Sequence, residues 1–121
     1  MAIQLENPHG GEFILREVDA EISRDEITLA SGQSLLAGAV LGAIAASGKY
    51  KEFDPAAVDG SQTAAAILFA ETDASAGDKK TVAVARLAAI KSASLLWKTG
   101  VTDNQKAAAL ASLATKFLIA R

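Results

Sequence analysis

The stretch GAVLGAIAASGKYKEFDPAAVDG, residues 38–60, alternates apolar segments with strong turn signals. We interpret residues 40–45 as a buried strand and residues 49–53 as a second strand, because the Ser-Gly pair between them favours a turn. Asp-Pro ends the second strand, and the Asp-Gly pair at residues 59 and 60 predicts another turn. This run therefore predicts short strands joined by turns.

The sequence on either side continues this pattern. Further strands are predicted at residues 27–29, 64–70 and 81–86. The last of these alternates with a period of two, so Arg86 is expected to point outward or toward an acidic partner. The fold class that follows is mainly β.

The C-terminal part has a different period. Thr102 or Asp103 is expected to cap a helix that runs to about residue 115, and residues 117–120 are expected to form a last short strand. One apolar stripe is predicted along this helix and beyond it, made of Ala107, Leu110, Leu113, Ala114 and Phe117. The sequence thus predicts a small single domain with one C-terminal α-helix.

Composition excludes several kinds of chemistry. The chain has 121 residues and a net charge of -2, which fits one domain and argues against a basic nucleic-acid binder. Cysteine is absent and His9 is the single histidine, so disulfides, thiolate nucleophiles and multi-histidine metal sites cannot be built within one chain. We expect no cofactor and no enzymatic activity. Alanine supplies 27 residues, which predicts a small core that gains from association with another surface.

The first 30 residues differ from the rest. They hold seven acidic and two basic side chains, a net charge of -5, against +3 for residues 31–121. A breaker cluster at residues 7–11 precedes an apolar group at Phe13, Ile14 and Leu15. We expect residues 1–25 to form a flexible arm that packs poorly in the isolated chain, and residues 26–121 to form the β domain.

Neither a membrane span nor a secretory signal is expected. Residues 27–48 are uncharged, but the unbroken apolar and glycine run covers only residues 35–46, which is about 18 Å of helix and too short for a bilayer. A buried strand bent at glycine is the better interpretation. The first residues carry no basic and apolar signal pattern, so synthesis in a reducing cytoplasm is expected.

Several short segments follow one another in a characteristic order. They are Gly-Ala-Val-Leu-Gly at 38–42, Ser-Gly-Lys-Tyr at 47–50, Asp-Pro-Ala-Ala at 54–57 and Asp-Gly-Ser-Gln-Thr-Ala at 59–64. Ile67-Leu68, the strand at 82–86, Leu96-Trp97 and the C-terminal helix come after them. In this order, the segments resemble the lambda-type bacteriophage head decoration proteins. The resemblance covers about residues 29–121. The individual motifs are short and non-catalytic, so their order and spacing carry the likeness.

The resemblance implies a β-clip-like structural protein without catalytic activity. Family members bind the outside of an expanded phage or prophage head as trimers at three-fold positions, and their partner is the major capsid protein. The implied location is the outer surface of the virion capsid. The family's N-terminal arm pairs with a capsid segment as an added strand, and in this chain Phe13, Ile14, Leu15 and Val18 would supply the side chains for capsid pockets.

A second hypothesis is a small β-rich carrier or adaptor domain that binds a soluble protein partner. Residues 71–75, Glu-Thr-Asp-Ala-Ser, are similar to the turn that carries lipoyl or biotinyl groups, but Ala74 stands where that turn has its lysine. A small-molecule enzyme is the third hypothesis. The sequence contains no Gly-x-Ser-x-Gly elbow, and its adjacent carboxylates are typical of a solvated surface.

Overall fold

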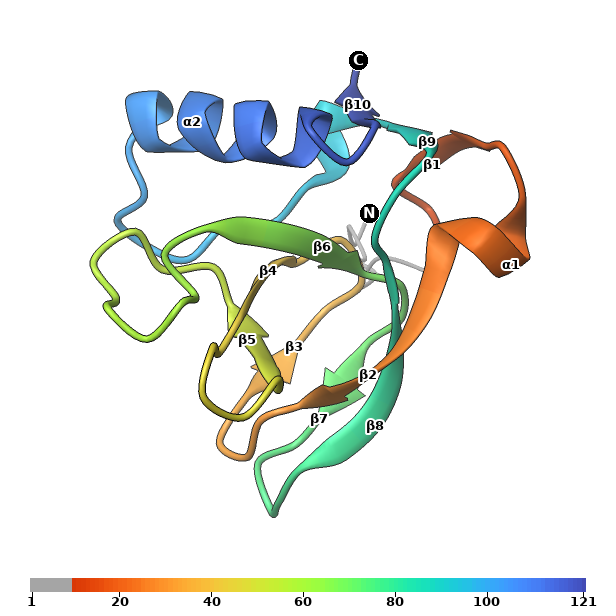
Figure 1. Ribbon diagram of the computed structural model, residues 1–121. Coiled ribbons are helices and arrows are strands. Elements are labelled where there is room, and N and C mark those ends of the chain that lie inside the picture. Colours follow the sequence, from red (N-terminus) through yellow and green to blue (C-terminus); the bar gives the residue numbers. More distant parts are fainter. Residues whose placement is uncertain (1–9) are drawn as a thin grey trace, which may run out of the picture.

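The structure is a computed structural model that describes residues 10–121, and it is mainly β, with 36% strand and 17% helix. Within these residues, ten strands form three sheets, and the one long helix lies near the C-terminus (Figure 1). The predicted fold class is confirmed. Five strands close into a barrel, three form a separate sheet, and two short strands pair with each other.

The barrel strands follow the spatial order β2, β5, β4, β6 and β8, and β8 pairs with β2 to close the ring. Their bounds are Arg24–Leu29 (β2), Val40–Ala43 (β4), Tyr50–Glu52 (β5), Ala64–Leu68 (β6) and Lys79–Val84 (β8). The sequence predicted all five strands to within three residues at each end. Their register fixes which side chains enter the core, because successive residues of a strand point to opposite faces.

Small side chains let the barrel strands pack closely. All five residues of β6, Ala-Ala-Ala-Ile-Leu, are buried. Gly42 on β4 lies so near the backbone of Ser61 that an added Cβ atom would be 2.5 Å from the Ser61 carbonyl oxygen. One core cluster draws its residues mainly from β2, β4, β6 and β8, with Leu29, Leu41 and Leu68 among its largest members. Alanine and glycine are therefore used where two stretches of backbone approach each other.

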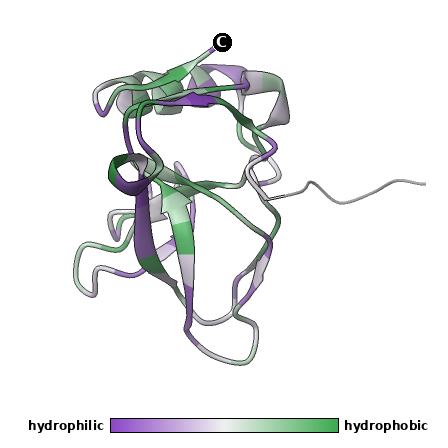
Figure 2. Cartoon of the chain, turned by 90° about the vertical axis from the view of Figure 1, so that its right-hand side faces the viewer, coloured by the Kyte–Doolittle hydropathy of each residue, from purple (hydrophilic) through white to green (hydrophobic). Residues whose placement is uncertain are grey.

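A second layer covers one end of the barrel. It contains the sheet β1 (Ile14–Glu17), β9 (Ala88–Ile90) and β10 (Leu118–Ala120), together with α2 (Asp103–Ala114). Strand β9 is central, with β1 antiparallel and β10 parallel to it. This layer and the C-terminus lie at one end of the molecule in both views, opposite the loops at the far end of the barrel (Figures 1 and 2). The predicted last strand is β10.

The predicted start of the helix is confirmed in detail. The Thr102 side-chain oxygen accepts a hydrogen bond from the backbone N–H of Gln105 at 3.2 Å. The Gln105 side chain in turn accepts one from the backbone N–H of Thr102 at 2.9 Å. This capping box satisfies two backbone donors that the first helical turn leaves without partners.

A larger core cluster joins the second layer to the barrel. Its largest buried members include Phe13, Phe53, Ile67, Ile90, Leu113 and Leu118. Trp97 packs against this cluster, with its ring edge-on to Phe53 at a centroid distance of 6.1 Å. The four remaining elements are α1 (Ala20–Ser23), β3 (Ser34–Leu35), β7 (Thr72–Asp73) and the short 3-10 helix η1 (Ser92–Ser94). No helix within residues 10–121 is long and apolar enough to cross a membrane.

The described part of the predicted arm, residues 10–25, is packed onto the domain in this structure. Phe13 is 1% exposed, β1 pairs with β9, and residues 24 and 25 already belong to β2. The Arg24 guanidinium binds both carboxylate oxygens of Glu17 and lies 4.2 Å from the centre of the Phe69 ring. Aromatic burial and this ion pair hold the segment in place. Residues 1–9 of the predicted arm lie outside the described residues.

The apolar stripe predicted for the C-terminal helix is only partly right. Leu113 and Ala109 are buried, but Ala107 and Ala114 are exposed. Phe117 is 64% exposed, because the chain leaves the helix before it and Phe117 itself has a φ of 60°. Phe117, which the helical period predicts to be a core residue, therefore lies on the surface.

Candidate functional site

The described residues show no group suited to metal-dependent chemistry. Residues 10–121 contain no cluster of three or more His, Cys, Asp or Glu side chains that could hold a metal ion. His9 lies outside this range. Residues 71–75 form the turn that is similar to the one carrying lipoyl or biotinyl groups. Within it, Ala74 is 1% exposed, and its backbone hydrogen-bonds to Gly32 and Gln33. A group attached at this position would have to displace a packed turn.

Exposed apolar side chains gather in two short segments. The large hydrophobic residues exposed within residues 10–121 are Leu15, Val18, Ile22, Val58, Phe117 and Ile119. All except Val58 fall in residues 15–22 or 117–119, which the fold brings together at the sheet of β1, β9 and β10. Grouped exposure of this kind is typical of an interaction surface, whereas single exposed apolar residues are common on any protein.

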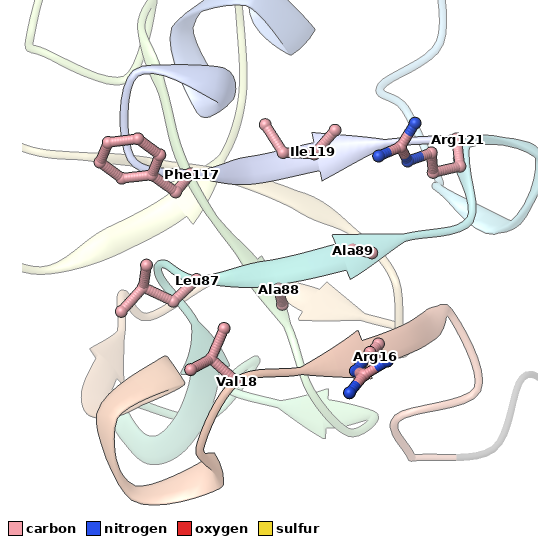
Figure 3. Close-up of a pocket in the computed structure, with 8 residues that line it drawn as sticks. All are labelled: Arg16, Val18, Leu87, Ala88, Ala89, Phe117, Ile119 and Arg121. Atoms are coloured by element: carbon pink, nitrogen blue, oxygen red, sulfur yellow. The ribbon is translucent and has the colours of Figure 1, made fainter.

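The sheet of β1, β9 and β10 has one face toward the core and one toward solvent. Ala88, Ile90 and Leu118 point into the larger core cluster. The opposite face, called the outer sheet face below, consists of Arg16, Val18, Leu87, Ala89, Phe117, Ile119 and Arg121, which line a shallow hollow (Figure 3). The register places Arg16 and Ile119 on either side of Ala89, whose small side chain forms the floor between them.

The two ends of the outer sheet face differ chemically. In Figure 3, Phe117, Leu87 and Val18 lie at one end of the hollow, and Arg16 and Arg121 lie at the other end, on either side of the central strand β9. A second hollow adjoins the apolar end and shares Leu87 and Phe117 with the first. No acidic side chain is among the residues that line either hollow.

Unusual backbone conformations hold the apolar end in place. Leu87 and Phe117, with φ values of 54° and 60°, are the non-glycine residues with positive φ within residues 10–121. This left-handed region costs a residue with a side chain about 1–2 kcal/mol. Hydrogen bonds fix both sites: the Leu87 carbonyl accepts from the Val18 N–H at 3.0 Å, and the Phe117 carbonyl accepts from the Ala88 N–H at 3.1 Å. Strain of this kind often marks functional surfaces.

The arginines near the sheet fall into two groups. Arg24 is paired with Glu17, and Arg86 binds both oxygens of Asp25. The hydrogen bond from Arg86 holds the pKa of Asp25 below its usual range and raises the pKa of Arg86 itself. Arg86 thus points to an acidic partner, as predicted. Within residues 10–121, neither Arg16 nor Arg121 has an acidic partner.

The structure separates the four residues predicted to bind through the arm. Phe13 is a core residue, and Ile14 is half-buried and packs partly against the core. Leu15 and Val18 are 53% and 74% exposed. Val18 joins the hollow, whereas Leu15 does not line it.

Sequence reasoning missed Leu87, Ile119, Arg16 and Arg121. One signal was available, because a strand at residues 117–120 puts Phe117, Ile119 and Arg121 on the same face. Because Phe117 also continues the apolar stripe of the helix, it was predicted to be a core residue instead.

Comparison with known proteins gives one family. The family model described as Bacteriophage lambda head decoration protein D matches residues 3–118. A search of curated proteins gave no match.

Proposed function

The chain belongs to the bacteriophage lambda head decoration protein D family and has a structural role in the phage capsid, and on this premise we propose how it acts. It binds the outer surface of an expanded phage or prophage capsid at three-fold positions and stabilises the shell. Its partners are the major capsid protein and two further copies of itself, which together form a homotrimer on the lattice. The family match over residues 3–118 carries this proposal.

The chemistry of the surface supports a role in binding rather than in catalysis. One end of the molecule exposes grouped apolar side chains on β1 and β10, and burying them against another protein contributes about 25 cal/mol per Å² of apolar area. A subunit that touches two neighbouring capsid proteins at once resists their separation, since the second contact forms at a high effective concentration. Cementing a shell requires no further chemistry.

The segment around β1 is the proposed capsid-binding part of the predicted arm. Within residues 10–121, β1 pairs with β9 along one edge and has no strand along the other. A capsid segment could therefore add as a further strand, with Leu15 and Val18 as the exposed apolar contacts. Deleting residues 1–20 would also remove Phe13 from the core, so L15S is the better test of this contribution, because Leu15 does not line the hollow of the outer sheet face.

Co-sedimentation with undecorated heads of the cognate phage tests the proposed function. We expect binding to expanded heads, none to compact heads, and saturation at a fixed ratio to capsid subunits. Decorated heads should also retain their DNA to a higher temperature than undecorated heads. If the folded protein, verified by circular dichroism, binds neither form, the capsid role at three-fold positions is overturned.

A further inference from the structure

We infer that the outer sheet face binds an extended segment of the major capsid protein that carries a large apolar side chain and, a few residues away, a carboxylate. This inference rests on the proposed function and specifies the chemistry of its partner. The apolar side chain would lie on Phe117, Leu87 and Val18. The carboxylate would lie between Arg16 and Arg121.

The backbone conformation keeps the side chains at the apolar end on the surface. Phe117 is 64% and Val18 is 74% exposed, whereas Ala88, Ile90 and Leu118 on the opposite face of the sheet are buried in the core. Phe117 and Leu87 are both held in the left-handed region by their hydrogen bonds, and this conformation directs their side chains to the same end of the hollow (Figure 3). A partner that covers this end removes a phenyl ring and two aliphatic side chains from water.

The other end requires a negative charge from the partner. Arg16 and Arg121 lie at the same end of the hollow, on either side of β9, and neither has an acidic partner within residues 10–121 (Figure 3). A protein that docks here takes both guanidinium groups out of water, and this is costly unless it brings an anion. Two guanidinium groups match a carboxylate well, because each offers paired donors.

The geometry favours an extended segment over a second copy of the same face. Phe117 and Arg121 are four residues apart, which corresponds to about 13 Å along a strand. A partner in extended conformation therefore presents its apolar and acidic side chains about four residues apart. Two copies of the outer sheet face packed on each other would set arginine against arginine or arginine against phenylalanine, and neither arrangement supplies the missing carboxylate.

Paired variants test both ends of the face by equilibrium binding to expanded heads. F117N removes the ring while Asn still tolerates the left-handed backbone, and R16Q/R121Q removes the two charges. We expect each to weaken binding about tenfold or more, as is usual for central contacts. The matched controls are V58N, at the 95% exposed apolar residue outside the face, and K79Q/K80Q, which removes two exposed charges on β8. Both should bind within about twofold of the parent.

A crosslinking experiment identifies the partner segment. Ile119 lies within the hollow on a regular strand, so benzoylphenylalanine at this position should leave the backbone unchanged. Irradiation on expanded heads and mass spectrometry should give a capsid-protein peptide with Asp or Glu within about four residues of the crosslink. Crosslinks to another copy of this chain, or to a capsid peptide without an acidic residue, would overturn the inference.

The outcomes separate this inference from the proposed function. If the parent protein binds expanded heads and F117N and R16Q/R121Q bind equally well, the outer sheet face is not the docking site, although the capsid role stands. If the parent does not bind heads at all, both are overturned. The inference is supported if F117N and R16Q/R121Q bind more weakly, the two control variants bind like the parent, and the expected crosslink forms.

Discussion

The strands of the barrel and the strands of the sheet β1, β9 and β10 differ in how many of their edges are paired with another strand. Each of the five barrel strands has neighbours on both sides, because β8 closes the ring with β2. Within residues 10–121, β1 and β10 each have a strand neighbour on one side only. Loops at the far end of the barrel are tied together, for example by the ion pair of Lys49 and Asp78 at 2.6 Å. The sheet end instead exposes Phe117 and Val18, and its Arg16 and Arg121 have no acidic partner within residues 10–121.

This difference indicates which part of the molecule is complete by itself. A closed barrel has no free strand edge and buries its apolar residues within the chain. The sheet end keeps free edges and apolar side chains that a second protein can cover. The comparison predicts that substitutions in the barrel core change folding, whereas substitutions on the outer sheet face change binding.

The largest effect is expected for F13A, which tests whether the residues around β1 belong to the folded domain. Removing a fully buried phenyl ring should lower the free energy of unfolding by about 3–5 kcal/mol. Urea unfolding followed by the fluorescence of Trp97, the single tryptophan, measures it. L15A, at an exposed position two residues away, should change stability by about 0.5 kcal/mol or less. Equal effects of the two variants would mean that this segment is not packed in solution.

A slightly smaller effect is expected for G42A in the barrel. The new Cβ atom would be 2.5 Å from the backbone of Ser61, a fully buried residue in the loop before β6. We expect a loss of about 2–3 kcal/mol in the free energy of unfolding. G77A is the control, because no atom lies within 4 Å of the added Cβ. It should be neutral or slightly stabilising, and a destabilisation equal to that of G42A would argue against the close strand packing.

F117N should separate stability from binding at the sheet end. Asn tolerates a φ near 60° better than Phe does, so we expect a gain of up to about 1 kcal/mol in the free energy of unfolding, with weaker binding to heads. Thermal unfolding and co-sedimentation on the same preparation measure both. A variant that loses stability would show that the Phe117 ring supports the fold.

The smallest effect concerns pH and the ion pair of Arg86 and Asp25. The lowered pKa of Asp25 means that its ionised form stabilises the fold, a contribution present above the ordinary value of 3.8 and lost as the pH falls through the lowered pKa. D25N should cost about 0.5–1 kcal/mol at pH 7, and its difference from the parent should shrink in acid. E26Q, at an exposed residue 3.9 Å from Lys80, is the matched control and should change stability by about 0.5 kcal/mol or less at pH 7. Urea titrations at pH 7, 5 and 3 would measure the difference in the free energy of unfolding between D25N and the parent.

Local patterns in the sequence determined the five strands of the barrel, the capped helix and the last strand. Strand alternation, Ser-Gly and Asp-Gly turns, and the Thr102 cap act over a few residues, so they can be read without knowing the fold. The order of short motifs also predicted the family, which the match over residues 3–118 confirms. The exclusion of multi-histidine and thiolate sites within one chain followed from counting residue types.

Tertiary structure alone decided where the N-terminal segment and Phe117 lie. An acidic segment with breakers predicts an arm, but Phe13 fits a core built from residues up to a hundred positions away, and Arg24 secures the segment through Glu17 and Phe69. The outer sheet face likewise depends on β9 bringing β1 and β10 together across the whole length of the chain. Such contacts are invisible to local patterns, because the burial of a side chain depends on which distant residues meet it.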